Sequence, residues 1–379
     1  MSIEITRRCP LSCPGCYAYS EGHLGAAGPL TRLRDFEGAQ LVAGVLSLVD
    51  HHRPLHLSIV GGEPLVRWRE ITELLPALER RGIHTQVVTS AVRPIPLEWR
   101  HARRFTLVVS IDGLQPEHDK RRAPATYEKV LRHIRGQAVT VHCTVTQQMT
   151  RGAGYLGKFV SFWAERPEVQ KIWMSLYPPQ KGETSPEILP PEVRARVIGE
   201  LSSLKDVFPK LELPAGLLQA YRRPPSDPGR CVFALTTRAI SADLKTVVTP
   251  CQLGGKPDCH QCGCIASAAL EAVSRHRLPI GIRTGAIYDV SRAVGFRLKA
   301  LRGADFTLDA RDPWVQLRRC STTLREIRPT DRNRATRGGQ EHGVQVRNST
   351  DPRKDPIQIV QGSAETGPVG YSALEHSPH

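Results

Sequence analysis

Short apolar stretches alternate with helix-like stretches along the first half of the chain, and this rhythm constrains the fold more than any other feature. Strand-like composition occurs at residues 3–5, 55–60, 85–89, 105–111, 138–146 and 173–177. Helical spacing of apolar residues occurs between them at residues 30–49, 71–81 and 127–135. Strands that alternate with helices predict βαβ units and a parallel sheet. We therefore predict an α/β fold, a partial (β/α)6 TIM-like barrel, over residues 1–210.

A polar motif follows each of the first four predicted strands. These motifs are residues 9–16, 61–64, 89–91 and 110–113. In parallel barrels, the loops after the carboxyl ends of the strands carry the active groups. The four motifs are therefore predicted to meet at one end of the barrel.

The first motif holds three thiols in the spacing C-x3-C-x2-C. Pro10 and Pro14 exclude a regular helix, so the thiols lie on a loop that can wrap around a ligand. Three thiols serve three irons of a [4Fe–4S] cube and leave the fourth iron without a protein ligand. A zinc site would need a fourth ligand, and His23 is poorly spaced for that role. Plain structural thiols are the third reading. The three residues are Cys9, Cys13 and Cys16.

A second group of thiols surrounds a hairpin-like stretch at residues 239–251, within an auxiliary region of residues 211–275. Four thiols fully ligate one [4Fe–4S] cube, which leaves one spare, although C-x2-C spacing also suits zinc. We expect Cys262 or Cys264 to be the spare thiol, because the two are so close in sequence. Cys143 and Cys320 are expected to be incidental. The group consists of Cys231, Cys251, Cys259, Cys262 and Cys264.

Composition narrows the class of protein. The 379 residues are 40% hydrophobic, enough for a real core, and contain neither a long apolar run nor a signal peptide. Clustered cysteines without an export signal predict a cytoplasmic metal-binding protein. A net charge of +15 suits an anionic substrate, a lipid surface or RNA, and it also suits a solvated basic surface without a function. Without an aromatic-rich RNA-binding motif, we expect no stable nucleic-acid partner.

The C-terminal part divides into a helical segment, residues 276–320, and a polar tail, residues 321–379, which we expect to be disordered. Residues 285–302 form an amphipathic helix with a basic side. Such a helix caps the protein's own core or makes a peripheral contact with an anionic membrane.

The order of the motifs resembles that of the radical S-adenosylmethionine (radical SAM) enzymes. The resemblance covers residues 2–180 and implies that Cys9, Cys13 and Cys16 hold a [4Fe–4S] cluster whose open iron binds SAM. It also implies reductive cleavage of SAM to a 5′-deoxyadenosyl radical that abstracts hydrogen from an unactivated carbon. A flavodoxin, ferredoxin or reductase would supply the electron. The adenine-side element Gly-x-Ile-x-Gly-x-x-Glu is missing. The residues matched to the SAM-binding elements are Gly61, Gly62, Glu63, Pro64, Ser90, Ser110, Asp112 and Arg122.

The second thiol group resembles a shortened SPASM or twitch domain, which shares the Pro-Cys pair after a hairpin, here Pro250-Cys251. Thr246 stands where that hairpin usually has glycine. The resemblance implies a second [4Fe–4S] cluster and a peptide, protein or other natural-product substrate. An isoprenoid or other lipid substrate is the alternative within the superfamily. A non-enzymatic iron–sulfur or zinc protein that binds RNA is the alternative of another class.

Overall fold

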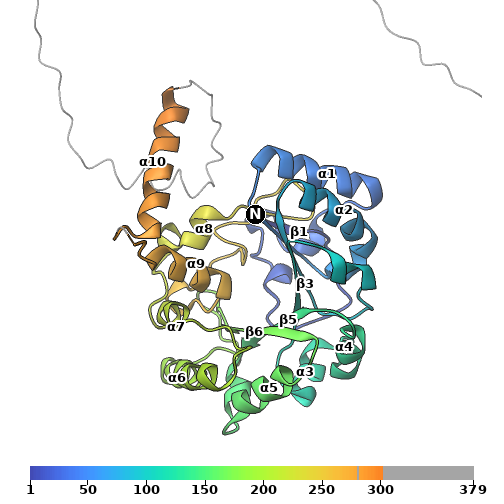
Figure 1. Cartoon of the computed structure of the whole chain (residues 1–379), viewed down its shortest axis with the longest axis vertical. Helices are drawn as coiled ribbons and strands as arrows, with labels where there is room; N and C mark the ends of the chain where they lie inside the picture. The colour runs from blue at the N-terminus through green and yellow to red at the C-terminus, as the bar shows by residue number, and fades with distance from the viewer. Residues whose placement is uncertain (280, 302–379) are drawn as a thin grey trace, which may run out of the picture. The chain divides into compact units, whose positions relative to one another are not determined.

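The computed structural model describes residues 1–279 and 281–301, and its core is a parallel sheet of seven strands (Figure 1). The strands lie in the order β6-β5-β4-β3-β2-β1-β7. Their bounds are β1 Ser2–Glu4, β2 His56–Val60, β3 His84–Thr89, β4 Phe105–Ser110, β5 Val139–Val145, β6 Val169–Leu176 and β7 Ala239–Ile240. The six predicted strands are present, so the prediction of a partial TIM-like α/β barrel is confirmed.

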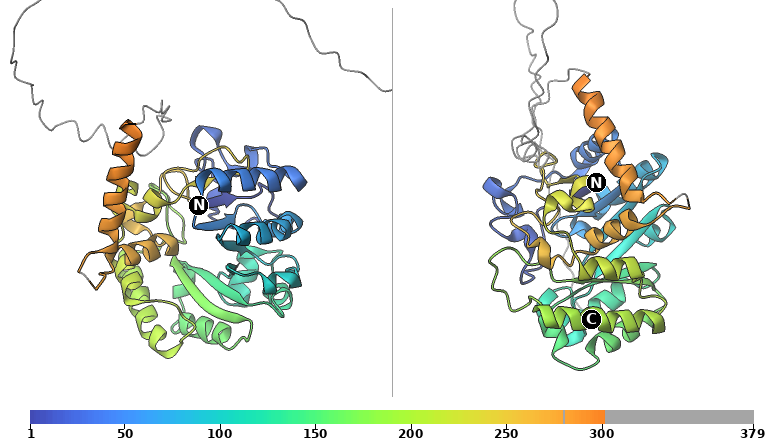
Figure 2. Two further views of the ribbon diagram at one scale, coloured as in Figure 1. Left: turned by 45° about the horizontal axis from the view of Figure 1, so that its top comes forward. Right: turned by 90° about the vertical axis from the view of Figure 1, so that its left-hand side faces the viewer.

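Helices surround the curved sheet (Figures 1 and 2). In α2, the side chains that face the core recur at helical spacing, from Ile71 through Leu74 and Leu75 to Leu78. They pack with buried strand residues such as Val87 and Leu107 in one core. The helices are α1 Gly38–His52, α2 Trp68–Arg80, α3 Gln115–Arg122, α4 Tyr127–His133, α5 Tyr155–Ala164, α6 Pro191–Val207, α7 Ala215–Arg222, α8 Val232–Thr236, α9 Ile265–Arg275 and α10 Thr284–Leu301.

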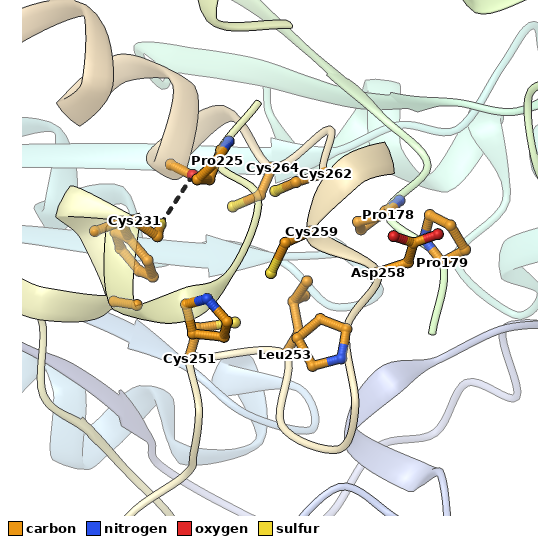
Figure 3. Close-up of a pocket in the computed structure, with 15 residues that line it drawn as sticks. Pro178, Pro179, Pro225, Cys231, Cys251, Leu253, Asp258, Cys259, Cys262 and Cys264 are labelled. Atoms are coloured by element: carbon orange, nitrogen blue, oxygen red, sulfur yellow. Dashed lines mark hydrogen bonds between the residues drawn. The ribbon is translucent and has the colours of Figure 1, made fainter. Parts of the chain in front are cut away.

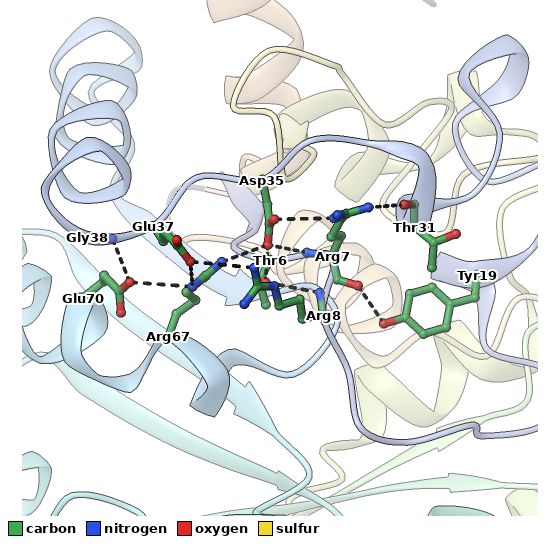
Figure 4. Close-up of polar contacts among 10 residues, drawn as sticks. All are labelled: Thr6, Arg7, Arg8, Tyr19, Thr31, Asp35, Glu37, Gly38, Arg67 and Glu70. Carbon is green, nitrogen blue, oxygen red and sulfur yellow. Dashed lines mark hydrogen bonds and ion pairs between the residues drawn. The ribbon is translucent and has the colours of Figure 1, made fainter.

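The helix predicted over residues 30–49 begins later, at Gly38. Figure 4 shows why: Asp35 accepts hydrogen bonds from Thr6 (2.5 Å) and from Arg67 (3.2 Å). Arg67 also donates to Glu37 at 2.9 Å. These bonds hold the segment before α1 in a non-helical conformation against the start of the cysteine loop, and they override its apolar spacing.

The hairpin-like stretch joins the barrel sheet. Strand β7 pairs in parallel with β1, with Ile240 opposite Ile3, and Ile240 also forms an antiparallel bridge with Val247. Helix α10 matches the predicted helix as far as residue 301. The predicted tail and Cys320 lie outside the described residues. None of the helices in the described part of the chain combines the length and apolarity that a membrane crossing requires.

Candidate functional site

The three thiols of residues 9–16 lie on an irregular loop beyond β1, half-buried, as the prolines predict. The amide of Leu11 donates to Sγ of Cys9 at 3.4 Å, and the amide of Cys16 donates to the carbonyl of Cys13 at 3.3 Å. Gly15 between them has a left-handed φ of 64°, and a Cβ there would lie 2.5 Å from the Tyr177 hydroxyl. The loop therefore turns tightly against the end of β6.

The three thiols share one electrostatic environment. Burial, with smaller contributions from Glu63 and the other two thiols, raises the pKa of Cys9 to about 11. Burial also raises the pKa of Cys13, while Arg122 opposes that shift. Cys9 and Cys13 are thus neutral near pH 7, and a metal that binds them must displace their protons.

The glycine pair after β2 lies against the cysteine loop. The amides of Gly62 and Glu63 donate to the carbonyls of Thr6 and Arg8, both at 2.8 Å. A Cβ on Gly61, whose φ is 127°, would lie 2.9 Å from the Thr6 carbonyl oxygen, and one on Gly62 would overlap the Arg8 carbonyl. The glycines therefore allow two loops of the protein to touch, a role that sequence reasoning did not assign to them.

Glu63 is a buried junction between the ends of β2 and β3. Its Oε1 accepts from the Leu65 amide at 2.9 Å and from the Thr89 hydroxyl. Its Oε2 accepts from the Ser90 amide at 2.8 Å and from the Ser90 hydroxyl at 2.5 Å. Pro64 begins the 3-10 helix Pro64–Arg67 that follows. The structure brings Glu63 and Ser90 together, as the strand-end rule predicts.

Asp112 is the anionic centre at the end of β4. Its Oδ2 accepts from Nε of Arg121 at 3.0 Å and of Arg122 at 2.7 Å. Burial alone would raise the pKa of Asp112, but the two guanidinium groups outweigh burial and hold it well below its usual range. The Arg122 side chain is only 19% exposed and its charge acts on Cys13, so it is not a solvated surface cation. Ser110 is buried at the last position of β4.

Sequence reasoning missed three polar residues near these groups. Glu187, in the loop after β6, pairs with Arg121, and nothing in its sequence surroundings marks it. Tyr177, directly after β6, donates to Glu183 at 2.6 Å, and the strand-end rule would have found it. His142 in β5 bonds Ser175 through Nε2 at 2.8 Å. Burial lowers the pKa of His142 to about 4, so the ring is neutral near pH 7.

His23 is fully buried and engaged through both ring nitrogens. Nε2 lies 2.7 Å from Glu4 and Nδ1 lies 3.2 Å from the Leu253 carbonyl. Ser241 donates to the other oxygen of Glu4 at 2.5 Å. His23 therefore links β1 to the auxiliary region, and in this conformation neither nitrogen is free to bind zinc.

The second group of thiols lines one pocket (Figure 3). Ser267 bonds Sγ of Cys231 at 3.2 Å, and Gln252 donates to Sγ of Cys264 at 3.4 Å. Burial raises the pKa of Cys259 and of Cys264 to about 12. The five thiols are Cys231, Cys251, Cys259, Cys262 and Cys264.

No group of three or more His, Cys, Asp or Glu residues in the described part of the chain is arranged to hold a single metal ion. In a [4Fe–4S] cube each thiolate binds a different iron, so its ligands stand farther apart than those of one ion. A pocket lined by five thiols, with few other polar groups, has the donor chemistry of a cluster site.

Residues 3–145, which carry β1 to β5 and the cysteine loop, match the model of the Radical SAM superfamily. Two similar curated proteins are both PqqA peptide cyclases. The one from Rhizobium meliloti is 34% identical over 122 residues, 31% of this chain and 30% of the relative. The one from Ruegeria pomeroyi is 38% identical over 99 residues, 25% of this chain and 23% of the relative. The chain thus spans less than a third of the length of either relative.

Similar solved structures include native anSMEcpe with bound AdoMet, with a TM-score of 0.47 and 17% identity over 66% of this chain and 74% of that one. They also include Streptococcus suis SuiB bound to precursor peptide SuiA, with a TM-score of 0.46 and 16% identity over 70% of this chain and 63% of that one. The family match covers the strands and loops that bring the three N-terminal thiols together with Glu63 and Asp112, and by it residues 3–145 belong to the radical SAM superfamily.

Proposed function

We propose that this chain reductively cleaves SAM at a cluster held by Cys9, Cys13 and Cys16. The observation that carries the proposal is the meeting of those thiols with the ends of β2, β3 and β4. Glu63 lies within electrostatic range of Cys9, and Arg122 and Asp112 lie within range of Cys13. This is the end of a parallel barrel where catalytic groups gather.

The cluster and SAM would supply the radical chemistry, and the protein's own groups bind and orient. The Arg122 guanidinium, fixed by Asp112, places a positive charge beside the thiol loop, where it favours an anionic cluster and a carboxylate. The Glu63 carboxylate places a negative charge on the side of Cys9, where it favours an ammonium group. The remaining groups proposed to line the cofactor are Gly61, Gly62, Pro64, Ser90 and Ser110.

We also propose that the second thiol pocket holds another [4Fe–4S] cluster. Its support is the convergence of Cys231, Cys251, Cys259, Cys262 and Cys264 on one pocket that also contains the apolar rings of several prolines. Such surroundings exclude water from a cluster.

A peptide is the substrate class that we propose. Its support is the similarity of part of the chain to two PqqA peptide cyclases. A substrate of another class, such as an isoprenoid lipid, remains an outcome that the assay below can reveal.

The test uses anaerobically reconstituted full-length protein with dithionite and SAM. We expect release of 5′-deoxyadenosine by the wild type and none by the variant in which Cys9, Cys13 and Cys16 are all alanine. Cys143→Ala, which removes a buried thiol of the core, is the matched control and should retain the activity. Cleavage of SAM by the triple variant would overturn the first cluster.

Metal analysis of the same preparations tests the second cluster. About eight irons per chain correspond to two cubes, whereas about four irons with stoichiometric zinc would leave only the first. Candidate peptides and prenyl lipids are added in parallel reactions. The substrate class is the one whose members increase the yield of 5′-deoxyadenosine and themselves change in mass.

A further inference from the structure

A cation of α6 reaches the loop that carries three of the auxiliary thiols. The guanidinium of Arg194 donates to the carbonyls of Gln261 at 3.1 Å and of Cys262 at 2.7 Å. It also donates to the carbonyl of Tyr221 in α7 at 3.1 Å. One side chain thus joins α6 and α7 to the loop between Cys259 and Cys264.

Arg194 has no carboxylate partner within ion-pair distance among the residues that the structure describes. The Arg194 side chain is half-buried. A cation that is partly removed from water without a counter-charge lowers the stability of the folded state. The carbonyl oxygens supply hydrogen bonds to the guanidinium but no net negative charge.

The pocket beside Arg194 gains negative charge only when its thiols lose their protons. Metal binding requires thiolates, and four thiolates around a [4Fe–4S] core of charge 2+ form a dianion. The charge of Arg194 is therefore opposite in sign to that of a bound cluster.

The loop is held firmly on its other side as well. The Leu176 amide at the end of β6 donates to the Gly263 carbonyl at 2.9 Å. A Cβ on Gly263 would overlap the Leu176 carbonyl, so the backbone between Cys262 and Cys264 lies directly against β6. Because both sides are fixed, the distance between Arg194 and the thiols is set by the fold.

We propose that Arg194 is the counter-charge and positioning residue of the auxiliary cluster, and that it raises the reduction potential of that cluster. The inference rests on the second cluster of the proposed function. One-electron reduction makes the cluster more negative, and a fixed cation favours the more negative form. Arg194 thereby makes the auxiliary cluster a better electron acceptor while it holds the loop in place.

The test compares three variants of the full-length, reconstituted protein. Arg194→Gln removes the charge, and Arg194→Lys retains it with fewer donors. Arg196→Gln makes the same chemical change at an exposed position of the same helix and serves as the control. The midpoint potential of each cluster is measured by redox titration followed by electron paramagnetic resonance, with iron content measured alongside.

For Arg194→Gln we expect a roughly tenfold weaker electron affinity of the auxiliary cluster, a downward shift of about 59 mV for one electron. The potential of the SAM-binding cluster should not change, and Arg194→Lys and Arg196→Gln should stay near the wild type. If Arg194→Gln holds eight irons per chain and the potential of its auxiliary cluster is unchanged, the inference is overturned, but the proposal of a second cluster is still supported.

Two further outcomes are decisive. If Arg194→Gln loses the auxiliary iron, the potential of Arg194→Lys decides: a wild-type value supports the counter-charge role, and a large downward shift overturns it. About four irons per chain in the wild type would contradict the proposal of a second cluster and, with it, this inference. The proposal of the first cluster would not be affected.

Discussion

Replacing Glu63 with glutamine changes one atom at a buried junction and tests how the ends of β2 and β3 are held together. In the wild type, the carboxylate accepts four hydrogen bonds. Two come from hydroxyl groups, which can rotate to a new partner. The other two come from the amides of Leu65 and Ser90, which cannot.

The loss of stability in Glu63→Gln follows from this difference between hydroxyl and amide donors. A glutamine side chain keeps one oxygen and presents an NH2 group in place of the other, so one of the two amides faces a donor whichever way the side chain is turned. An unsatisfied buried amide costs about 1–3 kcal/mol, and the remaining bonds lose the strength that the negative charge gives them. We expect Glu63→Gln to lower the free energy of unfolding by about 2–4 kcal/mol.

The assay is urea unfolding of the anaerobically purified, metal-free protein. Glu73→Gln, an exposed position of α2, is the control and should change the free energy of unfolding by less than about 0.5 kcal/mol. If Glu63→Gln unfolds like the control, the four-bond junction does not contribute to stability as described. On the reconstituted protein, equilibrium dialysis should show an affinity for SAM about ten- to a hundred-fold lower, and an unchanged affinity would remove Glu63 from the cofactor site.

Three further predictions concern the charges and the loops. Asp112→Asn leaves two guanidinium groups without their shared anion and should lower the free energy of unfolding in urea by about 3–5 kcal/mol. In the wild type, the contribution of Asp112 to stability should be lost as the pH drops below the ordinary aspartate pKa near 3.9. A variant as stable as the wild type would refute this prediction. Metal-free protein should lose stability as pH rises above about 8.5, because unfolded thiols ionise there whereas folded Cys259 and Cys264 hold their protons to about 12; equal unfolding midpoints at pH 7.5 and pH 9.5 would contradict this. Gly263→Ala should lose about four irons per chain, while Gly199→Ala, which has open space around it, should lose none.

The sequence predicts the barrel well because its signals are local. Buried parallel strands are short apolar runs, and each ends where a polar motif begins, so β2, β3 and β4 were found within one residue at either end. The meeting of Glu63, Ser90 and Asp112 at one end of the barrel follows from that register alone.

What the sequence did not reveal depends on contacts between distant segments. The late start of α1 comes from bonds of Asp35 to Thr6 and Arg67, which no window of neighbouring residues contains. The packing of Gly62 on the Arg8 carbonyl is hidden for the same reason, since a glycine pair looks the same whether it faces a ligand or another loop. Glu187 is a further case, because its partner Arg121 lies far away in the chain.

The pairing of β7 with β1 has a consequence for synthesis of the chain on the ribosome. Glu4 and Ser241, which bond beside this pair, are 237 positions apart, so β1 emerges long before the strand that covers its edge. At about 5–20 residues per second, that interval is roughly 10 to 50 seconds. During it, β1 has an uncovered edge, and Glu4 and His23 lack their partners Ser241 and Leu253. The nascent barrel therefore completes its sheet only once β7 has been made, which makes chaperone cover most valuable in that interval.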